Sequence, residues 1–185
     1  MEEFAFVLDY LQEGRPSTSF RRKIEPLAYV IGRDEFKLFE ISVRDSVEVG
    51  EKLYIGKELS KRKKVNRILR RIGFDELTGP AKSELPNILE QIVREKENIF
   101  VRFINTTGPI TTRFHSLELL PGFGKKMMWT VIEEREKKPF ESFEDLSQRT
   151  GLKNPEKVFA KRIEDELSGR EGRYFLFVRN ERETH

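Results

Sequence analysis

The chain has 185 residues and a net charge of +3, and 37% of its residues are hydrophobic while 36% are charged. Its 15 phenylalanines argue against an intrinsically disordered protein, because disordered chains are poor in aromatic residues. With no cysteine and two histidines, it lacks a disulfide framework, a thiol nucleophile, a thiolate metal ligand and a histidine cluster, and we expect no cofactor.

The first hundred residues predict a unit made mostly of strands. The apolar runs from Phe4 to Leu8 and from Leu27 to Ile31 have the composition of strands. The segment from Phe36 to Val43 largely alternates apolar with polar residues, which predicts a half-buried strand paired with the preceding one. Leu53 to Ile55 predicts a further short strand, and Arg15 to Ser19 predicts a loop.

A strongly basic segment follows between residues 57 and 71, where eight cations stand against Glu58 and give a local net charge of +7. Apolar residues recur at helical spacing from Val65 to Ile72, which predicts an amphipathic helix ended by Gly73. Such a field attracts polyanions; the alternative is a solvated face whose cations pair with glutamates. The candidate nucleic-acid contacts in this segment are Lys61, Arg62, Lys63, Lys64, Arg67, Arg70 and Arg71.

The middle and the end of the chain complete this unit. A second helix is predicted from Ser83 to Lys96, and a strand from Ile99 to Ile104. The last apolar run, Arg173 to Arg179, predicts a strand that returns to the amino-terminal sheet. Short strands, glycine turns and an internal helix resemble an OB-like antiparallel β-barrel. Another small α+β sheet is the alternative interpretation.

The most informative stretch runs from Ser116 to Leu146. A helix is expected to end at Leu120, Pro121 stops it, and a tight turn from Gly122 to Gly124 leads into a second helix at Lys125. Such a turn leaves several backbone N–H groups unpaired at the positive end of a helix dipole, which suits a phosphate. The alternative is a pair of solvated lysines in a first helical turn. The predicted contacts are Gly122, Phe123, Gly124, Lys125 and Lys126.

These residues resemble the helix-hairpin-helix family, whose hairpin reads apolar-Pro-Gly-apolar-Gly. Downstream, Pro139 and Phe140 precede a helix start at Ser142, with Asp145 placed for a capping box. This pattern is similar to the tandem form found in bacterial competence DNA receptors. The resemblance covers residues 112–168 and implies phosphate binding by the hairpin; an unrelated helical hairpin is the alternative. Taken whole, the chain resembles an uncharacterised archaeal family of unknown function in which nucleic-acid binding is suspected.

A second hairpin is predicted between Gly151 and Asn154, with Asn154 and Pro155 starting the last helix. It departs from the family pattern, because Leu-Lys-Asn stands where Gly-apolar-Gly is usual. Residues 139–171 carry six basic and eight acidic side chains, and this balance opposes a phosphate backbone. Gly151, Lys153 and Asn154 are therefore predicted to be structural or to make a weaker contact.

The sequence predicts an α+β protein of two domains, residues 1–108 with the returning strand 172–179, and a tandem helix-hairpin-helix domain over residues 109–170. We expect non-enzymatic nucleic-acid binding with little sequence specificity, RNA being slightly favoured over DNA. The alternatives are a protein-interaction adaptor and an enzyme whose carboxylates converge only in space. Trp129 is predicted to be a buried anchor rather than a stacking platform.

Known catalytic patterns and targeting signals are missing from the sequence. It has no plausible Ser-His-Asp set and no P-loop or Rossmann glycine pattern, which argues against those enzyme classes. No apolar run approaches the length of a transmembrane helix, and the start lacks the features of a signal peptide. We therefore expect a cytoplasmic protein, and its dense mixed charge is typical of thermophiles.

Overall fold

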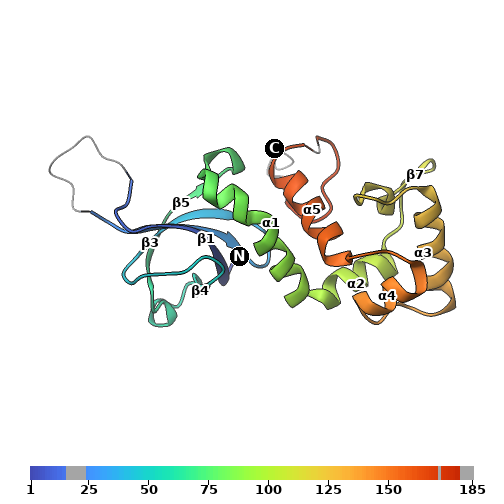
Figure 1. The fold of residues 1–185 in the computed structure, drawn as a ribbon, viewed down its shortest axis with the longest axis horizontal. Helices are drawn as coiled ribbons and strands as arrows, with labels where there is room; N and C mark the ends of the chain where they lie inside the picture. The colour runs from blue at the N-terminus through green and yellow to red at the C-terminus, as the bar shows by residue number, and fades with distance from the viewer. Residues whose placement is uncertain (16–23, 171, 180–185) are drawn as a thin grey trace. The chain divides into compact units, whose positions relative to one another are not determined.

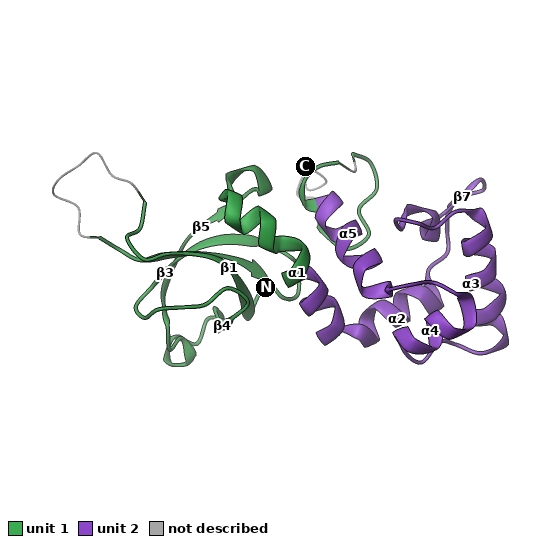
Figure 2. Cartoon of the chain, viewed as in Figure 1, with its two compact units in different colours: residues 1–88, 167–185 green, residues 89–166 purple. Residues whose placement is uncertain are grey.

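The computed structural model describes residues 1–15, 24–170 and 172–179. In this part of the chain it has a mixed α+β fold with a curled, five-stranded antiparallel sheet and five α-helices (Figure 1). The chain divides into two compact units, residues 1–88 with 167–185 and residues 89–166 (Figure 2). The domain boundary expected at residue 108 stays a prediction.

The sheet of the first unit forms a half-barrel. Its strands are β1 (Phe4–Leu11), β2 (Leu27–Gly32), β3 (Leu38–Val43), β4 (Lys52–Tyr54) and β5 (Val65–Ile72), and they lie in the order β4-β1-β2-β3-β5. The expected strands in the first sixty residues are therefore confirmed. The loop expected from Arg15 to Ser19 lies, except for its first residue, outside the described part of the chain.

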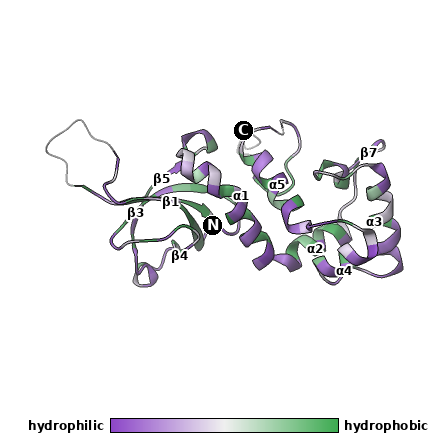
Figure 3. Cartoon of the chain, viewed as in Figure 1, coloured by the Kyte–Doolittle hydropathy of each residue, from purple (hydrophilic) through white to green (hydrophobic). Residues whose placement is uncertain are grey.

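The central strand β2 is buried along its whole length, which explains its continuous apolar sequence. Figure 3 shows hydrophobic residues, in green, along the strands of this sheet. One face of the sheet carries a closed apolar cluster made of Ala5, Val7, Ala28, Val30, Ile41, Val43, Val47, Leu53, Ile55 and Val65. Asp9 lies near the C-terminal end of β1, and its carboxylate accepts from the Thr78 hydroxyl at 2.6 Å. This bond ties the start of helix α1 (Gly79–Glu95) to the strand.

The second half of the basic segment is strand β5, and the amphipathic helix predicted from Val65 to Ile72 is wrong. Strand β5 pairs with β3, but Asn66 and Leu69 have no partner in the register, so the strand bulges twice. One bulge brings Val65 and Ile68, three residues apart, onto the same face of the sheet. A spacing that is typical of a helix is thus produced by an irregular strand.

Two further expectations about secondary structure are wrong. The strand predicted from Ile99 to Ile104 is part of helix α2 (Glu97–Thr106), because Phe100, Val101 and Ile104 are buried on one helical face. Residues 172–179 form no strand, although they belong to the first unit. Neither edge of the sheet offers them a regular ladder, since β4 has three residues and β5 is bulged.

The second unit is mainly helical. A small hairpin of β6 (Pro109–Thr111) and β7 (Phe114–His115) leads into the 3₁₀ turn η3 (Ser116–Leu119). Helices α3 (Lys125–Lys137), α4 (Phe143–Thr150) and α5 (Pro155–Leu167) follow. The Phe159 ring is central to the core, with ring centroids of Phe100 and Phe143 at 4.8 Å and 5.8 Å from it.

Candidate nucleic-acid interface

The turn between η3 and α3 has the conformation of a type II β-turn. The Leu120 carbonyl accepts from the Phe123 N–H at 3.0 Å, with Pro121 and Gly122 in the two central positions. Gly122 has a φ of +79°, which this turn type requires and which L-residues rarely adopt. Phe123 is only 6% exposed, so its side chain is buried beneath the turn. The element before the turn is a short 3₁₀ helix and not the α-helix that a helical hairpin would supply.

The start of α3 is open to solvent. The first N–H bonded within the helix is that of Met128, which donates to the Gly124 carbonyl at 3.0 Å. The preceding amides lie in the first turn, which has no acidic residue, and Gly124, Lys125 and Lys126 are exposed. A Cβ atom added at Gly122 or Gly124 would meet nothing within 4 Å. The amides, the lysines and the helix dipole together make this helix start positive and accessible.

The two glycines of the turn have different reasons to be glycine. Gly122 is needed for its positive φ, whereas Gly124 has φ −83° and ψ 179°, a conformation open to any residue. At Gly124 the missing side chain therefore has another consequence, which is that a ligand can approach the backbone closely.

A buried ion pair on α5 holds the segment before the turn. Arg162 is 1% exposed, and its Nε donates to the Glu166 carboxylate at 2.9 Å while its Nη1 donates to the Leu119 carbonyl at 3.1 Å. Sequence reasoning missed this pair, because it followed only the apolar spacing of α5. The available signal was an Arg and a Glu four residues apart on the same face as Phe159 and Ile163.

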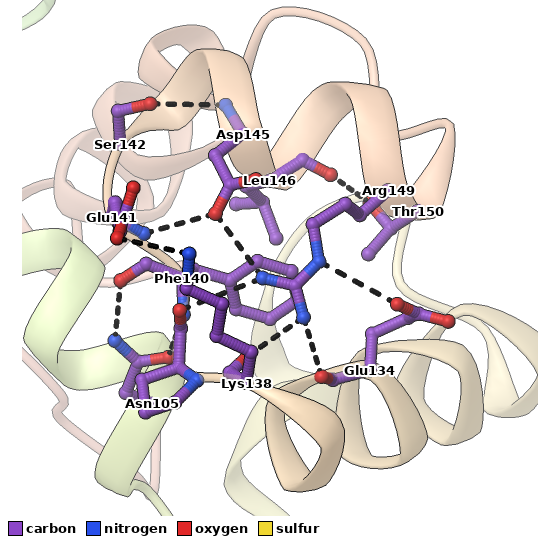
Figure 4. Close-up of polar contacts among 11 residues, drawn as sticks. Asn105, Glu134, Lys138, Phe140, Glu141, Ser142, Asp145, Leu146, Arg149 and Thr150 are labelled. Atoms are coloured by element: carbon purple, nitrogen blue, oxygen red, sulfur yellow. Dashed lines mark hydrogen bonds and ion pairs between the residues drawn. The ribbon is translucent and has the colours of Figure 1, made fainter.

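The other end of α3 is fixed by Arg149 (Figure 4). Its guanidinium lies over the Phe140 ring, donates to the Lys138 carbonyl at 2.7 Å and pairs with Asp145 at 3.1 Å. Its Nη2 also donates to the Glu134 carbonyl at 2.5 Å. One side chain thereby joins the end of α3, the following loop and α4.

The predicted helix start at Ser142 is confirmed, since its Oγ accepts from the Asp145 N–H at 3.0 Å. The predicted capping box is displaced by one residue, because the Asp145 carboxylate accepts from the Glu141 N–H at 3.0 Å. Nearby, the Asn105 side chain exchanges two hydrogen bonds with the Phe140 backbone, at 2.9 Å and 2.8 Å, and ties α2 to the same loop.

A groove of about 520 Å³ lies beside the turn, between the β6–β7 hairpin and α3. Trp129 lines it and is 56% exposed, so the expectation of a buried anchor is wrong. The remaining lining residues are Pro109, Thr111, Thr112, Arg113, Phe114, His115, Glu118, Lys125, Met128 and Ile132.

His115 caps η3 at the edge of this groove. Its Nδ1 accepts from the Leu117 N–H at 3.1 Å, and its own N–H donates to the Glu118 carboxylate at 2.9 Å. Burial, helped by the nearby Arg135 charge, lowers the pKa of His115 below its ordinary value of 6.5. The ring is therefore neutral at pH 7, with its proton on Nε2.

Comparison with known proteins places the chain in a family. Residues 1–179 match a family described as a protein of unknown function, DUF655. The chain belongs to this family. It is 47% identical over 181 residues to an uncharacterized protein, MJ0038, of Methanocaldococcus jannaschii, covering 96% of this chain and 80% of that relative. The crystal structure of the DUF655 protein Af1531 from Archaeoglobus fulgidus is similar at a TM-score of 0.86 and 46% identity, covering 96% of this chain and all of that one.

In this DUF655 chain several cations of the basic segment pair with glutamates, as the alternative interpretation of a solvated face expected. Lys61 pairs with Glu58 at 2.7 Å, and Lys64 pairs with Glu51 at 2.6 Å. Arg67 pairs with Glu25 and Arg70 with Glu40 and Glu76. Arg62 donates to the carbonyls of Ile55 and Gly56, Arg71 is exposed on β5, and Lys57 and Lys63 are exposed. The field of this segment is therefore smaller than its sequence charge indicates, and its role stays a prediction.

The second hairpin repeats only part of the first. Gly151 has a φ of +77°, like Gly122, and is followed by the buried Leu152, as Gly122 is followed by Phe123. Lys153 is exposed, but Asn154 has a φ of +47° where Gly124 is extended, and Glu156 lies in the first turn of α5. An extra residue and a carboxylate make this turn a poorer anion site.

Among the described residues, no three His, Cys, Asp or Glu side chains converge as metal ligands would. In the same part of the chain, none of the helices has both the length and the apolar composition needed to cross a membrane.

Proposed function

We propose that this protein is a non-enzymatic nucleic-acid-binding protein that holds the sugar-phosphate backbone at the turn from Gly122 to Lys126. The observation that carries the proposal is the exposed start of α3, whose first turn has unpaired amides and two lysines and contains no acidic residue. The likeness of the turn from Gly122 to Lys126 to a helix-hairpin-helix turn supports the same role. We interpret the half-barrel as OB-like, and for that reason RNA is the first ligand to test.

Binding at this site has little sequence specificity. Backbone amides and lysines contact phosphate oxygens, which are the same for every base. Affinity should fall with salt, and each neutralised phosphate lowers the slope of log K against log salt by about 0.7 to 0.9.

The test is a substitution that strengthens the helix while it blocks the site. In Gly124→Asp, the new carboxylate caps α3, which raises the free energy of unfolding by a few tenths of a kcal/mol. The same carboxylate occupies the amides and repels phosphate, so affinity for single-stranded RNA should fall at least tenfold, the worth of about one charge-assisted hydrogen bond. Fluorescence anisotropy of a labelled oligonucleotide and thermal unfolding measure the two effects.

Two further variants serve as controls. Gly124→Asn has the same shape without the charge and should give an intermediate affinity. Gly108→Ala adds a methyl group to open space elsewhere in the same unit and should bind like the wild type. Unchanged affinity in Gly124→Asp would refute the role of the turn. If the wild type binds neither RNA nor DNA at low salt, a protein-interaction adaptor becomes the better interpretation.

A further inference from the structure

The groove beside the turn has features that phosphate binding does not use. Trp129 lies one helical turn after Lys125 on α3, and both side chains line the groove. A large aromatic ring left 56% exposed forgoes much of the stabilisation that burial would give it. Met128, which is buried, and the half-buried Ile132 and Phe114 add apolar walls next to this ring.

The rim of the groove is mainly basic. Arg113, at the turn between β6 and β7, and Lys125, at the start of α3, are both exposed there. One carboxylate, Glu118, also lines the groove, and it already accepts from the His115 backbone. His115 contributes a neutral ring whose Nε2 carries a proton. A ring with apolar faces and polar edges, next to a negative group, suits this lining.

We propose that this groove receives one unpaired base of a single-stranded nucleic acid, stacked on Trp129. The inference deepens the proposed function and rests on it, because the phosphate of the same strand would lie on the amides of Gly124 to Lys126. Residues four apart on a helix are about 5 to 6 Å apart at Cβ, which is comparable with the span from a phosphate to its own base. Bases in a duplex are stacked on each other and cannot reach Trp129.

Trp129 also provides the test, since it is the single tryptophan of the chain. Titrating the full-length protein with a short single-stranded RNA should quench its fluorescence, because a stacked base quenches indole emission. An abasic oligonucleotide of equal length and charge should bind about 5- to 100-fold more weakly and leave the emission unchanged. Duplex RNA should likewise leave it unchanged.

Variants of the ring separate stacking from folding. Trp129→Ala should lower affinity for the single strand to that for the abasic strand, as measured by anisotropy of the labelled oligonucleotide. Trp129→Phe should retain most of the affinity, because a smaller ring still stacks. Ile99→Ala is the matched control, since it removes a 51% exposed apolar side chain of α2 that does not line the groove.

The outcomes distinguish the two proposals. Equal affinity for both strands with unquenched Trp129, together with weaker binding by Gly124→Asp, overturns the base site and leaves the phosphate site in place. Quenching by the RNA with no effect of Gly124→Asp supports the base site and overturns the phosphate site. If neither strand binds at low salt, both proposals are overturned.

Discussion

His115 shows how one side chain can serve a local structure and line a groove at once. Its Nδ1 is used by the Leu117 amide, so the ring cannot be protonated there without losing the cap of η3. Burial and the Arg135 charge act in the same direction and favour the neutral ring. The ring is thus held in one tautomer with its donor nitrogen available.

We predict that His115 titrates below pH 6.5. Because its pKa is lowered on folding, the unfolded chain binds more protons below that pH, and stability falls as pH decreases from 6.5 through the folded pKa. An NMR titration of the imidazole C–H signals measures the midpoint. His115→Gln assigns the signal against that of the chain's other histidine, and a midpoint at or above 6.5 would contradict the prediction.

At the scale of elements, the corner between α3 and α4 depends on a single guanidinium. Arg149 contacts backbone carbonyls from the end of α3 and the following loop, and it pairs with carboxylates on both helices. These contacts need a planar group with several fixed donors, which lysine does not have. The corner in turn sets where α3 ends.

We predict that Arg149→Ala lowers the free energy of unfolding by about 2 to 3 kcal/mol, because several charge-assisted hydrogen bonds are lost and carbonyls are left unpaired. For a chain of this length the melting temperature should fall by about 5 to 10 °C. Arg149→Lys should recover less than half of the loss. Arg102→Ala removes an exposed arginine from the same unit and should change the melting temperature little; a similar fall in both would argue against the network.

Sequence patterns predicted most elements whose signals are local. The central strands are continuous apolar runs, α1 has clean helical spacing, and α4 begins at a Ser cap. The errors come from tertiary effects. The bulges of β5 place a helical spacing on a strand, and α2 is helical because its Phe100 face packs on Phe159. The turn at Gly122 was predictable, but the groove was not, since it needs β6–β7 and α3 together.

At the scale of the whole molecule, the count of charges misrepresents where free positive charge lies. The chain carries +3 in total, and its densest basic segment is on β5 and the loop before it. In that segment several cations pair with carboxylates, whereas the first turn of α3 contains no carboxylate to pair with its lysines. Pairing rather than number therefore decides which region is ready for a polyanion.

A comparison of two double variants tests this view. Lys125→Ala with Lys126→Ala should lower RNA affinity about tenfold and reduce the salt slope by about 1.4 to 1.8. Lys61→Ala with Lys64→Ala removes the same charge but should change the slope much less, because these lysines are paired with Glu58 and Glu51. Equal effects of the two double variants would show that the basic segment also holds nucleic acid.

The two bulges of β5 have a consequence for association between copies of this protein. β5 is an edge of its sheet, and a regular outer strand invites a neighbouring chain to extend the ladder. Two unpaired residues and the side chains of Arg67, Arg70 and Arg71 interrupt that template. The irregularity that disguises this strand in the sequence therefore also makes it a poor template for pairing with another edge strand.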